Sequence, residues 1–159
     1  MEKKLHQLGR IDRNILRALQ RNGRLSIAAL AREVGLTTTP CKERVRRLER
    51  EGAIRGYHAR LDPGWLNAAL VVFVQIRLNR TSQDIFEEFT RSASALPEVQ
   101  ECFLVSGNFD YLIKARVADM DAYRKFLGET LLTLPGVQES TSYVAMEQVK
   151  ETLELQVPY

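Results

Sequence analysis

The sequence predicts an α+β chain of two domains, a helix-turn-helix domain of winged-helix-like type followed by a ferredoxin-like βαββαβ domain. Three observations support this. Residues 26–50 have the pattern of two short helices around a tight turn. Residues 1–60 carry 15 Lys and Arg against 6 Asp and Glu, whereas residues 61–159 carry 8 against 14. The motif LPEVQE at residues 96–101 recurs as LPGVQE at residues 134–139, as expected for a domain built of two similar halves.

Three helices are predicted for the first domain. Ile11, Ile15 and Leu19 recur at helical spacing, and an Asn-Gly pair at residues 22–23 ends a helix over about residues 10–21. This helix precedes the two helices around the tight turn and completes a three-helix unit.

The tight turn has its own signals. Ser26 can cap the helix before it, and Gly35 follows that helix, where glycine adopts a left-handed conformation without steric cost. Thr37 or Thr39 can cap the helix after the turn. Pro40 then falls in the first turn of that helix, where a missing N–H costs little.

The helix over residues 38–50 is amphipathic. Cys41, Val45 and Leu48 share one face and should pack inward, while polar and basic residues occupy the other. A recognition helix presents its N-terminal residues to base edges and its flanks to phosphates, the role expected here of Arg47 and Arg50. The candidate DNA-binding residues are Ser26, Thr38, Thr39, Lys42, Glu43, Arg46, Arg47 and Arg50. The alternative is a solvated charged helix with ordinary Glu–Arg pairs.

The charge asymmetry favours the DNA-binding alternative. A strongly basic first part attracts a polyanion such as double-stranded DNA, whereas an acidic second part is repelled by one. The second part should therefore serve another purpose.

The composition argues against a membrane protein, a metal protein or an enzyme. The longest apolar run, residues 68–74, is too short to span a bilayer, and no signal peptide is evident. Cys41 and Cys102 lack metal-ligand spacing, as do His6 and His58. No catalytic motif is present. We expect a cytoplasmic protein with two reduced, buried cysteines, no metal and no catalytic residue.

The second domain should begin after a hinge at residues 62–64, which divides the chain into domains 1–61 and 62–159. Before the hinge, residues 54–61 have an extended pattern. The apolar alternation of residues 70–78 predicts a strand that is covered on both faces, because Val71 and Phe73 are also apolar. The remaining predicted elements are a helix at 84–95, strands at 99–106 and 111–117, a helix at 120–133, a strand at 137–146, and an added strand in the tail at 147–159.

One turn in this domain suggests a binding site. Gly107 and Asn108 offer free backbone N–H groups that can bind a carboxylate, and Asp110 can pair with an ammonium, so together they could hold a free amino acid. The alternative is a plain hairpin turn in which Asp110 bonds its own backbone. From the residues alone, the plain turn is favoured.

Several long runs carry a resemblance to a known family. They are IDRNIL at 11–16, TPC at 39–41, ERVRRLE at 43–49, QEC at 100–102, LVSG at 104–107, FDYL at 109–112, AYRK at 122–125 and LPGV at 134–137. Across essentially its full length, the chain resembles the Lrp/AsnC family of bacterial and archaeal transcription regulators. That family joins a helix-turn-helix domain to a βαββαβ domain that binds amino-acid effectors and builds the oligomer.

The resemblance implies a homo-oligomer. Dimers would form through the sheets and through residues 54–61, and would assemble further into octamers. An amino-acid effector, leucine above all, would bind between dimers. The residues carried over to this site are Gly107, Asn108, Phe109, Asp110, Tyr111, Met120, Tyr143, Val144 and Ala145. Asn108 stands where we associate an aspartate with the family, which removes one negative charge beside the site.

The function predicted is a sequence-specific DNA-binding transcription regulator on the bacterial nucleoid, whose assembly or DNA affinity responds to an amino acid. Two alternatives remain. One is an architectural protein that compacts DNA without ligand control, which sequence-indifferent, salt-dependent binding would favour. The other is an amino-acid-binding regulatory subunit of an enzyme, against which the basic helix-turn-helix argues.

Overall fold

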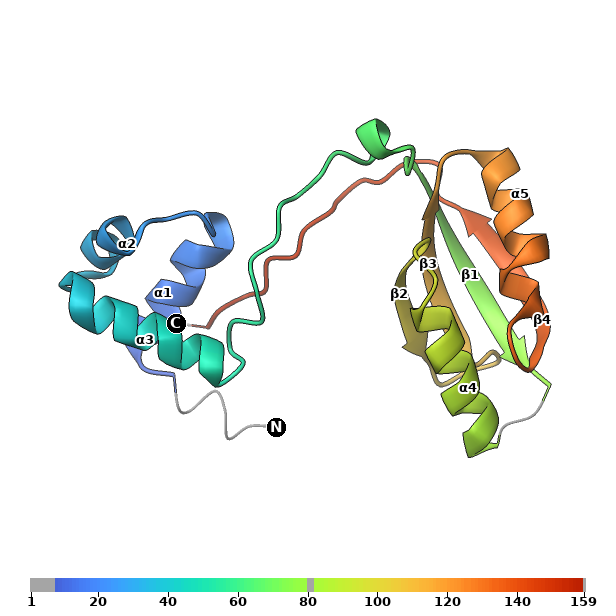
Figure 1. The fold of residues 1–159 in the computed structure, drawn as a ribbon, viewed down its shortest axis with the longest axis horizontal. Helices are drawn as coiled ribbons and strands as arrows, with labels where there is room; N and C mark the ends of the chain where they lie inside the picture. The colour runs from blue at the N-terminus through green and yellow to red at the C-terminus, as the bar shows by residue number, and fades with distance from the viewer. Residues whose placement is uncertain (1–7, 80–81, 159) are drawn as a thin grey trace. The chain divides into compact units, whose positions relative to one another are not determined.

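The computed structural model describes residues 8–79 and 82–158, which form two compact units (Figure 1). The first unit holds residues 8–60 and 150–158, and the second holds residues 61–149. The predicted α+β class is confirmed, because three helices make up the first unit and an antiparallel sheet with helices makes up the second. The tail at residues 150–158, which the sequence predicts in the second domain, packs with the first unit instead.

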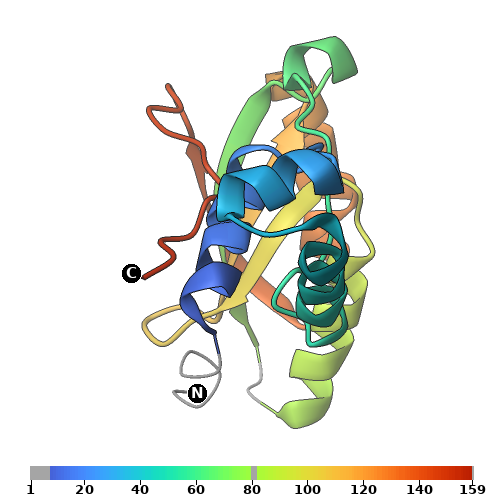
Figure 2. The same ribbon diagram turned by 90° about the vertical axis from the view of Figure 1, so that its left-hand side faces the viewer.

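The first unit contains α1 (Arg10–Arg21), α2 (Ile27–Val34) and α3 (Thr38–Arg50), which appear in Figure 2. The side chain of Ser26 caps α2 by accepting a hydrogen bond from the backbone N–H of Ala29 at 3.2 Å. Gly35 ends α2 in the left-handed conformation with φ of 72°. Ser26 and Gly35 therefore act as predicted, whereas Thr37 occupies the N-cap position of α3 without a side-chain cap hydrogen bond. The buried core consists of Ile15, Ala18, Leu30, Ala31, Val34, Cys41, Val45 and Leu48.

The second unit is a four-stranded sheet with two helices. Its elements are β1 (Leu70–Leu78), α4 (Gln83–Ser94), β2 (Val99–Leu104), β3 (Tyr111–Val117), α5 (Met120–Glu129) and β4 (Val137–Val144). The strand order is β2-β3-β1-β4 with every neighbouring pair antiparallel, which is the ferredoxin-like arrangement. Short 3-10 segments lie at Pro63–Leu66 and Leu131–Thr133.

Three predicted elements differ, besides shifts of one or two residues at the ends of others. Helix α5, predicted to run to residue 133, ends at Glu129, because the chain continues there into a 3-10 segment. Neither the extended segment at residues 54–60 nor the tail at 150–158 forms a strand, because no edge of the sheet pairs with either of them.

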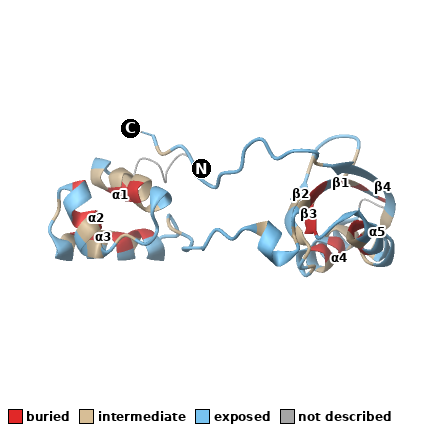
Figure 3. Ribbon diagram, turned by 90° about the horizontal axis from the view of Figure 1, so that it is seen from above, coloured by how far each residue is buried: buried red, intermediate tan, exposed pale blue. Residues whose placement is uncertain are grey.

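Both helices lie on the same side of the sheet and cover that face (Figure 3). Val72, Val74 and Ile76 of β1 are fully buried beneath them. On the opposite face the side chain of Phe73 remains 37% exposed. Val71 on that face is only 6% exposed, so the prediction that β1 is covered on both faces is confirmed for Val71 and wrong for Phe73 in the single chain. This second face is called the open sheet face below.

Gly136 explains the single difference between the two copies of the repeated motif. Its φ is +75°, and a Cβ built at this position would lie 2.6 Å from Cγ2 of Ile85 on α4. The first copy carries Glu98 at the corresponding position, where φ is not positive. Only glycine fits at Gly136 without strain and without displacing α4.

Gly136→Ala is therefore expected to destabilise the second unit by about 3 kcal/mol, from left-handed strain and overpacking together. Urea unfolding measures this. Gly128→Ala is the matched control, since Gly128 lies in α5 with nothing within 4 Å of an added Cβ. That variant should be stabilised by roughly 0.5–1 kcal/mol. Equal unfolding midpoints for the two variants would contradict the expectation.

Candidate DNA-binding face and effector site

Helix α3 presents one polar face to solvent. Cys41, Val45 and Leu48 are buried against α1 and α2, as the helical spacing predicts. The side chains on the opposite face are exposed, and they are Thr38, Thr39, Lys42, Glu43, Arg46 and Arg50. This group forms the candidate DNA-binding face, with three cations and one carboxylate that can reach a groove edge or a phosphate.

Arg47 does not belong to this face. Its guanidinium Nη2 lies 2.6 Å from Oδ2 of Asp12 on α1, so the predicted phosphate contact by Arg47 needs correcting. Arg44, one turn earlier on the same side of α3, places Nη1 3.0 Å from Oδ1 of the same carboxylate. Residues three apart on a helix share a face, so Arg44 and Arg47 both turn toward α1.

Asp12 is the residue of this site that the sequence reasoning missed. Its side chain is almost fully buried, and Oδ2 also accepts a hydrogen bond from the backbone N–H of Gly9 at 3.3 Å. A buried carboxylate that two arginines bind fixes α3 against α1. The signal was present in the helical spacing, which puts Asp12 on the same face as Ile15.

Ser26 is exposed, but its hydroxyl oxygen is engaged as the cap of α2. Its contribution to DNA binding stays a prediction. A helix N-terminus of this kind offers free backbone N–H groups, which suit a phosphate.

Tyr57 ties the linker to the DNA-binding unit. Its hydroxyl donates a hydrogen bond to Oε1 of Glu49 on α3 at 3.0 Å. Its ring lies close to Gly23, since a Cβ added there would be 3.2 Å from Cδ1 of Tyr57. Burial, followed by the hydrogen bond and the charge of Glu49, raises the pKa of Tyr57 to about 12.

This shift predicts a dependence of stability on pH. The folded-state pKa of Tyr57 lies above the unfolded value of 10.0, so its contribution is complete below pH 10 and is lost as pH rises toward 12. Because Tyr57 is 47% exposed, the Tyr57→Phe variant should lose only about 0.5 kcal/mol near pH 8. Urea unfolding at pH 8 and pH 11 should show this difference shrinking. A difference that is unchanged at pH 11 would contradict the assignment.

In the second unit, the predicted effector turn is anchored by its own polar groups. The backbone N–H of Leu78 donates to Oδ2 of Asp110 at 2.7 Å, and the N–H of Asp110 donates to the carbonyl of Ile76 at 2.9 Å. Asp110 therefore already has one oxygen engaged in joining the turn to β1. This structural bond differs from both alternatives that the sequence allowed, because its partner is the neighbouring strand.

Tyr111 belongs to the core and not to an exposed site. Its ring lies 4.4 Å from that of Phe89, centroid to centroid, and its side chain is buried. The hydroxyl of Tyr111 contacts Oγ1 of Thr90 at 3.0 Å. Since β3 alternates its side chains, the side chain of Tyr111 points toward the helices and away from the open sheet face, so only its backbone adjoins the predicted effector turn.

A shallow pocket of about 100 Å³ lies beside the turn on the open sheet face. It is lined by Gln75, Arg77, Asn108, Phe109, Glu139, Ser140 and Thr141. Arg77 crosses it, with Nε donating to the carbonyl of Asn108 at 3.1 Å and Nη1 lying 3.3 Å from Oε2 of Glu139. Sequence reasoning missed the strand residues of this pocket, because only the sheet register brings β1 and β4 beside the turn.

The other predicted effector residues lie at the far end of the sheet within one chain. Val144 pairs with Val72, and the strand β3 that precedes Met120 ends opposite Leu70. The turn adjoins the opposite end of β1, where Ile76 pairs with Tyr111. At about 3.3 Å per residue, the two ends are more than 10 Å apart. Met120, Tyr143, Val144 and Ala145 could therefore join the turn only by coming from a neighbouring chain.

The part of the chain that the structure describes shows neither a metal site nor a membrane-spanning helix. Those residues contain no cluster of His, Cys, Asp or Glu that could hold a metal ion. No helix among residues 8–79 and 82–158 is long and apolar enough to cross a membrane. Cys41 is buried and Cys102 half-buried, and burial raises the pKa of both thiols.

The two units match two known family models. Residues 8–55 match a winged helix-turn-helix DNA-binding model, and residues 71–155 match the Lrp/AsnC ligand binding domain. A winged helix-turn-helix DNA-binding domain joined to a ligand binding domain defines a ligand-responsive transcription regulator rather than an enzyme. The chain belongs to the Lrp/AsnC family.

Individual members of the family are similar to this chain over most of its length. The chain is 60% identical over 145 residues to the leucine-responsive regulatory proteins of Escherichia coli strain K12 and Klebsiella pneumoniae, covering 91% of this chain and 88% of each relative. A transcriptional regulator from Neisseria meningitidis, solved with L-methionine, is similar with a TM-score of 0.88 and 38% identity, over 94% of this chain and 96% of that one. An AsnC family transcriptional regulator from Agrobacterium tumefaciens is similar with a TM-score of 0.89 and 40% sequence identity. The match covers 94% of this chain and 97% of that one.

Proposed function

We propose that this protein is a sequence-specific DNA-binding regulator whose assembly or DNA affinity changes when it binds an amino acid, with leucine the first candidate. Its place would be the cytoplasm, on the nucleoid. The observation that carries the proposal is the exposed polar face of α3 in a chain whose second unit matches a ligand-binding domain.

The DNA-binding face supports groove reading. Lys42 and Arg46 lie one turn apart on the exposed side of α3, at a spacing that lets both reach neighbouring base edges or phosphates. Asp12 holds the opposite side of α3 through Arg44 and Arg47. A recognition helix held this way loses little freedom when it binds DNA.

The open sheet face supports a homodimer. Three aromatic side chains remain exposed there, Phe73 at 37%, Phe103 at 49% and Tyr143 at 51%. The register places Phe73 directly beside Tyr143, so these two side chains form one apolar patch. A second copy of the sheet would cover this patch, and the dimer would then place two recognition helices on the half-sites of a palindromic DNA site. Assembly of such dimers into octamers is part of the same proposal.

The effector site is proposed to form between chains. One chain would supply the turn residues Gly107, Asn108, Phe109 and Asp110, and a neighbour would supply Met120, Tyr143, Val144 and Ala145. Free backbone N–H groups at the turn suit a carboxylate, and the apolar residues suit an aliphatic side chain. The methionine bound in the relative from Neisseria meningitidis is an apolar amino acid of similar size to leucine. A ligand at such a site shifts the assembly by its differential affinity for the two states.

Sedimentation velocity tests this proposal. The purified protein is measured with leucine, methionine, alanine and D-leucine, and DNA affinity is measured in parallel at fixed salt concentration. We expect an L-specific shift between assemblies together with a change in DNA affinity. Binding that responds to no amino acid and is indifferent to DNA sequence would overturn it and favour an architectural protein. Asp110→Asn keeps an acceptor for Leu78 but loses the charge, and it should weaken the effector response.

A further inference from the structure

The tail, residues 150–158, has a specific partner on α1. The side-chain amide of Gln20 donates to the carbonyl of Leu155 at 2.9 Å and accepts from the backbone N–H of the same residue at 2.7 Å. The backbone of a neighbouring antiparallel strand bonds the N–H and the C=O of one residue in the same way. Gln20 thus satisfies both backbone groups of Leu155 in a segment that forms no strand.

Arg17, one turn before Gln20, binds the end of the same segment. Its Nη2 donates to the carbonyl of Val157 at 3.1 Å and to that of Pro158 at 2.7 Å. Its Nη1 donates to Oδ1 of Asn14 at 3.0 Å, which helps to orient the guanidinium. Arg17 and Gln20 thus bind the extended backbone of the tail directly, and Asn14 helps to hold Arg17 in place.

The apolar side chains of the tail do not explain its placement. Leu153 is 93% exposed and Leu155 is 77% exposed, while Val157 alone is half-buried. Polar recognition of the tail backbone, rather than burial of the tail side chains, therefore fixes the tail on α1.

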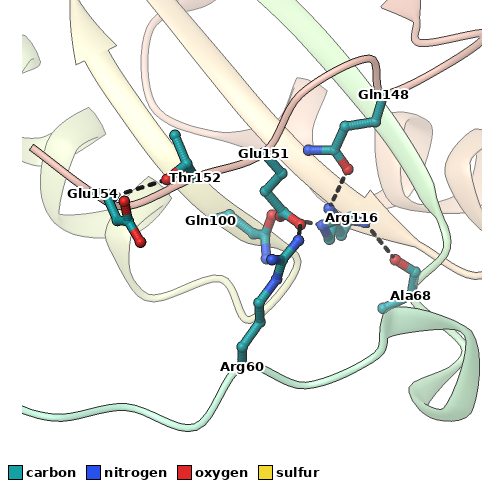
Figure 4. A network of polar contacts seen from close by, with 8 residues as sticks. All are labelled: Arg60, Ala68, Gln100, Arg116, Gln148, Glu151, Thr152 and Glu154. Carbon is teal, nitrogen blue, oxygen red and sulfur yellow. Dashed lines mark hydrogen bonds and ion pairs between the residues drawn. The ribbon is translucent and has the colours of Figure 1, made fainter. Parts of the chain in front are cut away.

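Polar contacts also hold the chain where it leaves the first unit and where it follows β4 in the second (Figure 4). In the first unit, Nη2 of Arg60 lies 2.9 Å from Oε2 of Glu151, so the outgoing linker is bound to the returning tail. In the second unit, the buried guanidinium of Arg116 donates to Oε1 of Gln100 at 2.9 Å and to Oε1 of Gln148 at 3.0 Å. Gln148 follows β4, and only residues 145–149 separate that strand from the tail.

We propose that the face of α1 formed by Arg17 and Gln20 is a docking site for the tail of this chain, and that the docked tail conveys effector binding to the DNA-binding unit. The docking rests on the contacts above. The second part rests on the proposed function. A displacement of the end of β4 would pass along residues 145–149 to a segment held on α1, in addition to the connection through the linker.

Hydrogen exchange of the full-length protein, read by mass spectrometry at equal assembly state, tests the docking. In Gln20→Ala, the peptides that cover residues 150–158 should exchange about ten-fold faster, as the loss of two hydrogen bonds implies. Arg17→Ala should act in the same direction. Arg10→Ala is the matched control, an exposed arginine in the first turn of α1, and should leave tail exchange unchanged. Exchange within α1 checks that the helix remains folded.

The second readout is the change in DNA affinity caused by leucine or methionine. We expect Gln20→Ala to bind DNA normally without effector and to lose most of the effector-induced change. Unaltered tail exchange in Gln20→Ala would overturn the docking site. Faster tail exchange with a full effector response would overturn the coupling. If the wild-type protein shows no effector response, the proposed function fails, and with it the coupling, while the exchange measurement still decides the docking.

Discussion

Arg46→Ala is expected to weaken DNA binding by about ten-fold to one hundred-fold while leaving the oligomer intact. Arg46 is exposed at the middle of the candidate DNA-binding face, and a good side-chain contact to a base edge contributes about 1–3 kcal/mol. The proposed dimer would lose the contact at both half-sites, and two losses at the lower end of that range, about 1 kcal/mol each, correspond to about thirty-fold. Fluorescence anisotropy of a labelled DNA site at fixed salt concentration measures the affinity.

Arg91→Ala is the matched control for Arg46→Ala. Arg91 is an exposed arginine on α4 of the other unit, so the variant removes the same charge away from the candidate face. It should bind DNA almost as the wild-type protein does. Wild-type affinity in Arg46→Ala, or a loss of assembly in sedimentation, would show that α3 serves a structural purpose instead.

Asp12→Ala is expected to destabilise the DNA-binding unit by about 3 kcal/mol. The substitution removes a buried carboxylate that binds Arg44, Arg47 and the backbone N–H of Gly9. Breaking a buried ion pair costs about 3–5 kcal/mol, and the lower end applies because both arginine side chains remain 37% exposed and can regain water. Differential scanning calorimetry should show a lower melting temperature for one of two transitions.

Asp12→Asn keeps the shape and the acceptor oxygen of the side chain but not its charge. This variant should lose less stability than Asp12→Ala, and DNA affinity should fall in proportion to the loss of order in α3. If both variants melt as the wild-type protein does, the Asp12 cluster does not hold α3 in place.

Much of the fold was predictable because its signals are local. The left-handed glycine after α2, the cap at Ser26 and the apolar spacing of α3 depend only on neighbours along the chain. The limits of β3 at Tyr111 and Val117 also match the predicted strand. The exposed side of α3 followed from helical geometry, since its inner face is apolar.

The candidate sites were less predictable because charge and turn motifs do not reveal their partners. Arg47 resembles any arginine of a basic helix until α1 brings Asp12 within 2.6 Å of it. From the sequence, Asp110 fits an effector turn, but in the structure its carboxylate accepts a hydrogen bond from the N–H of Leu78 on β1. A polar side chain takes whichever partner the tertiary structure places nearby, and in a low-dielectric interior that choice dominates its energetics.

The sequence by itself determined the two-domain α+β organisation, the recognition helix and the ferredoxin-like order of elements, because periodicity, capping and charge are read along the chain. The tertiary structure alone decided which side chains meet. It turned Arg47 inward, put Tyr111 in the core, separated Met120 from the turn at Gly107, and joined residues 150–158 to α1. These contacts join residues far apart in sequence, and their geometry depends on helix packing and strand register, which no local pattern specifies.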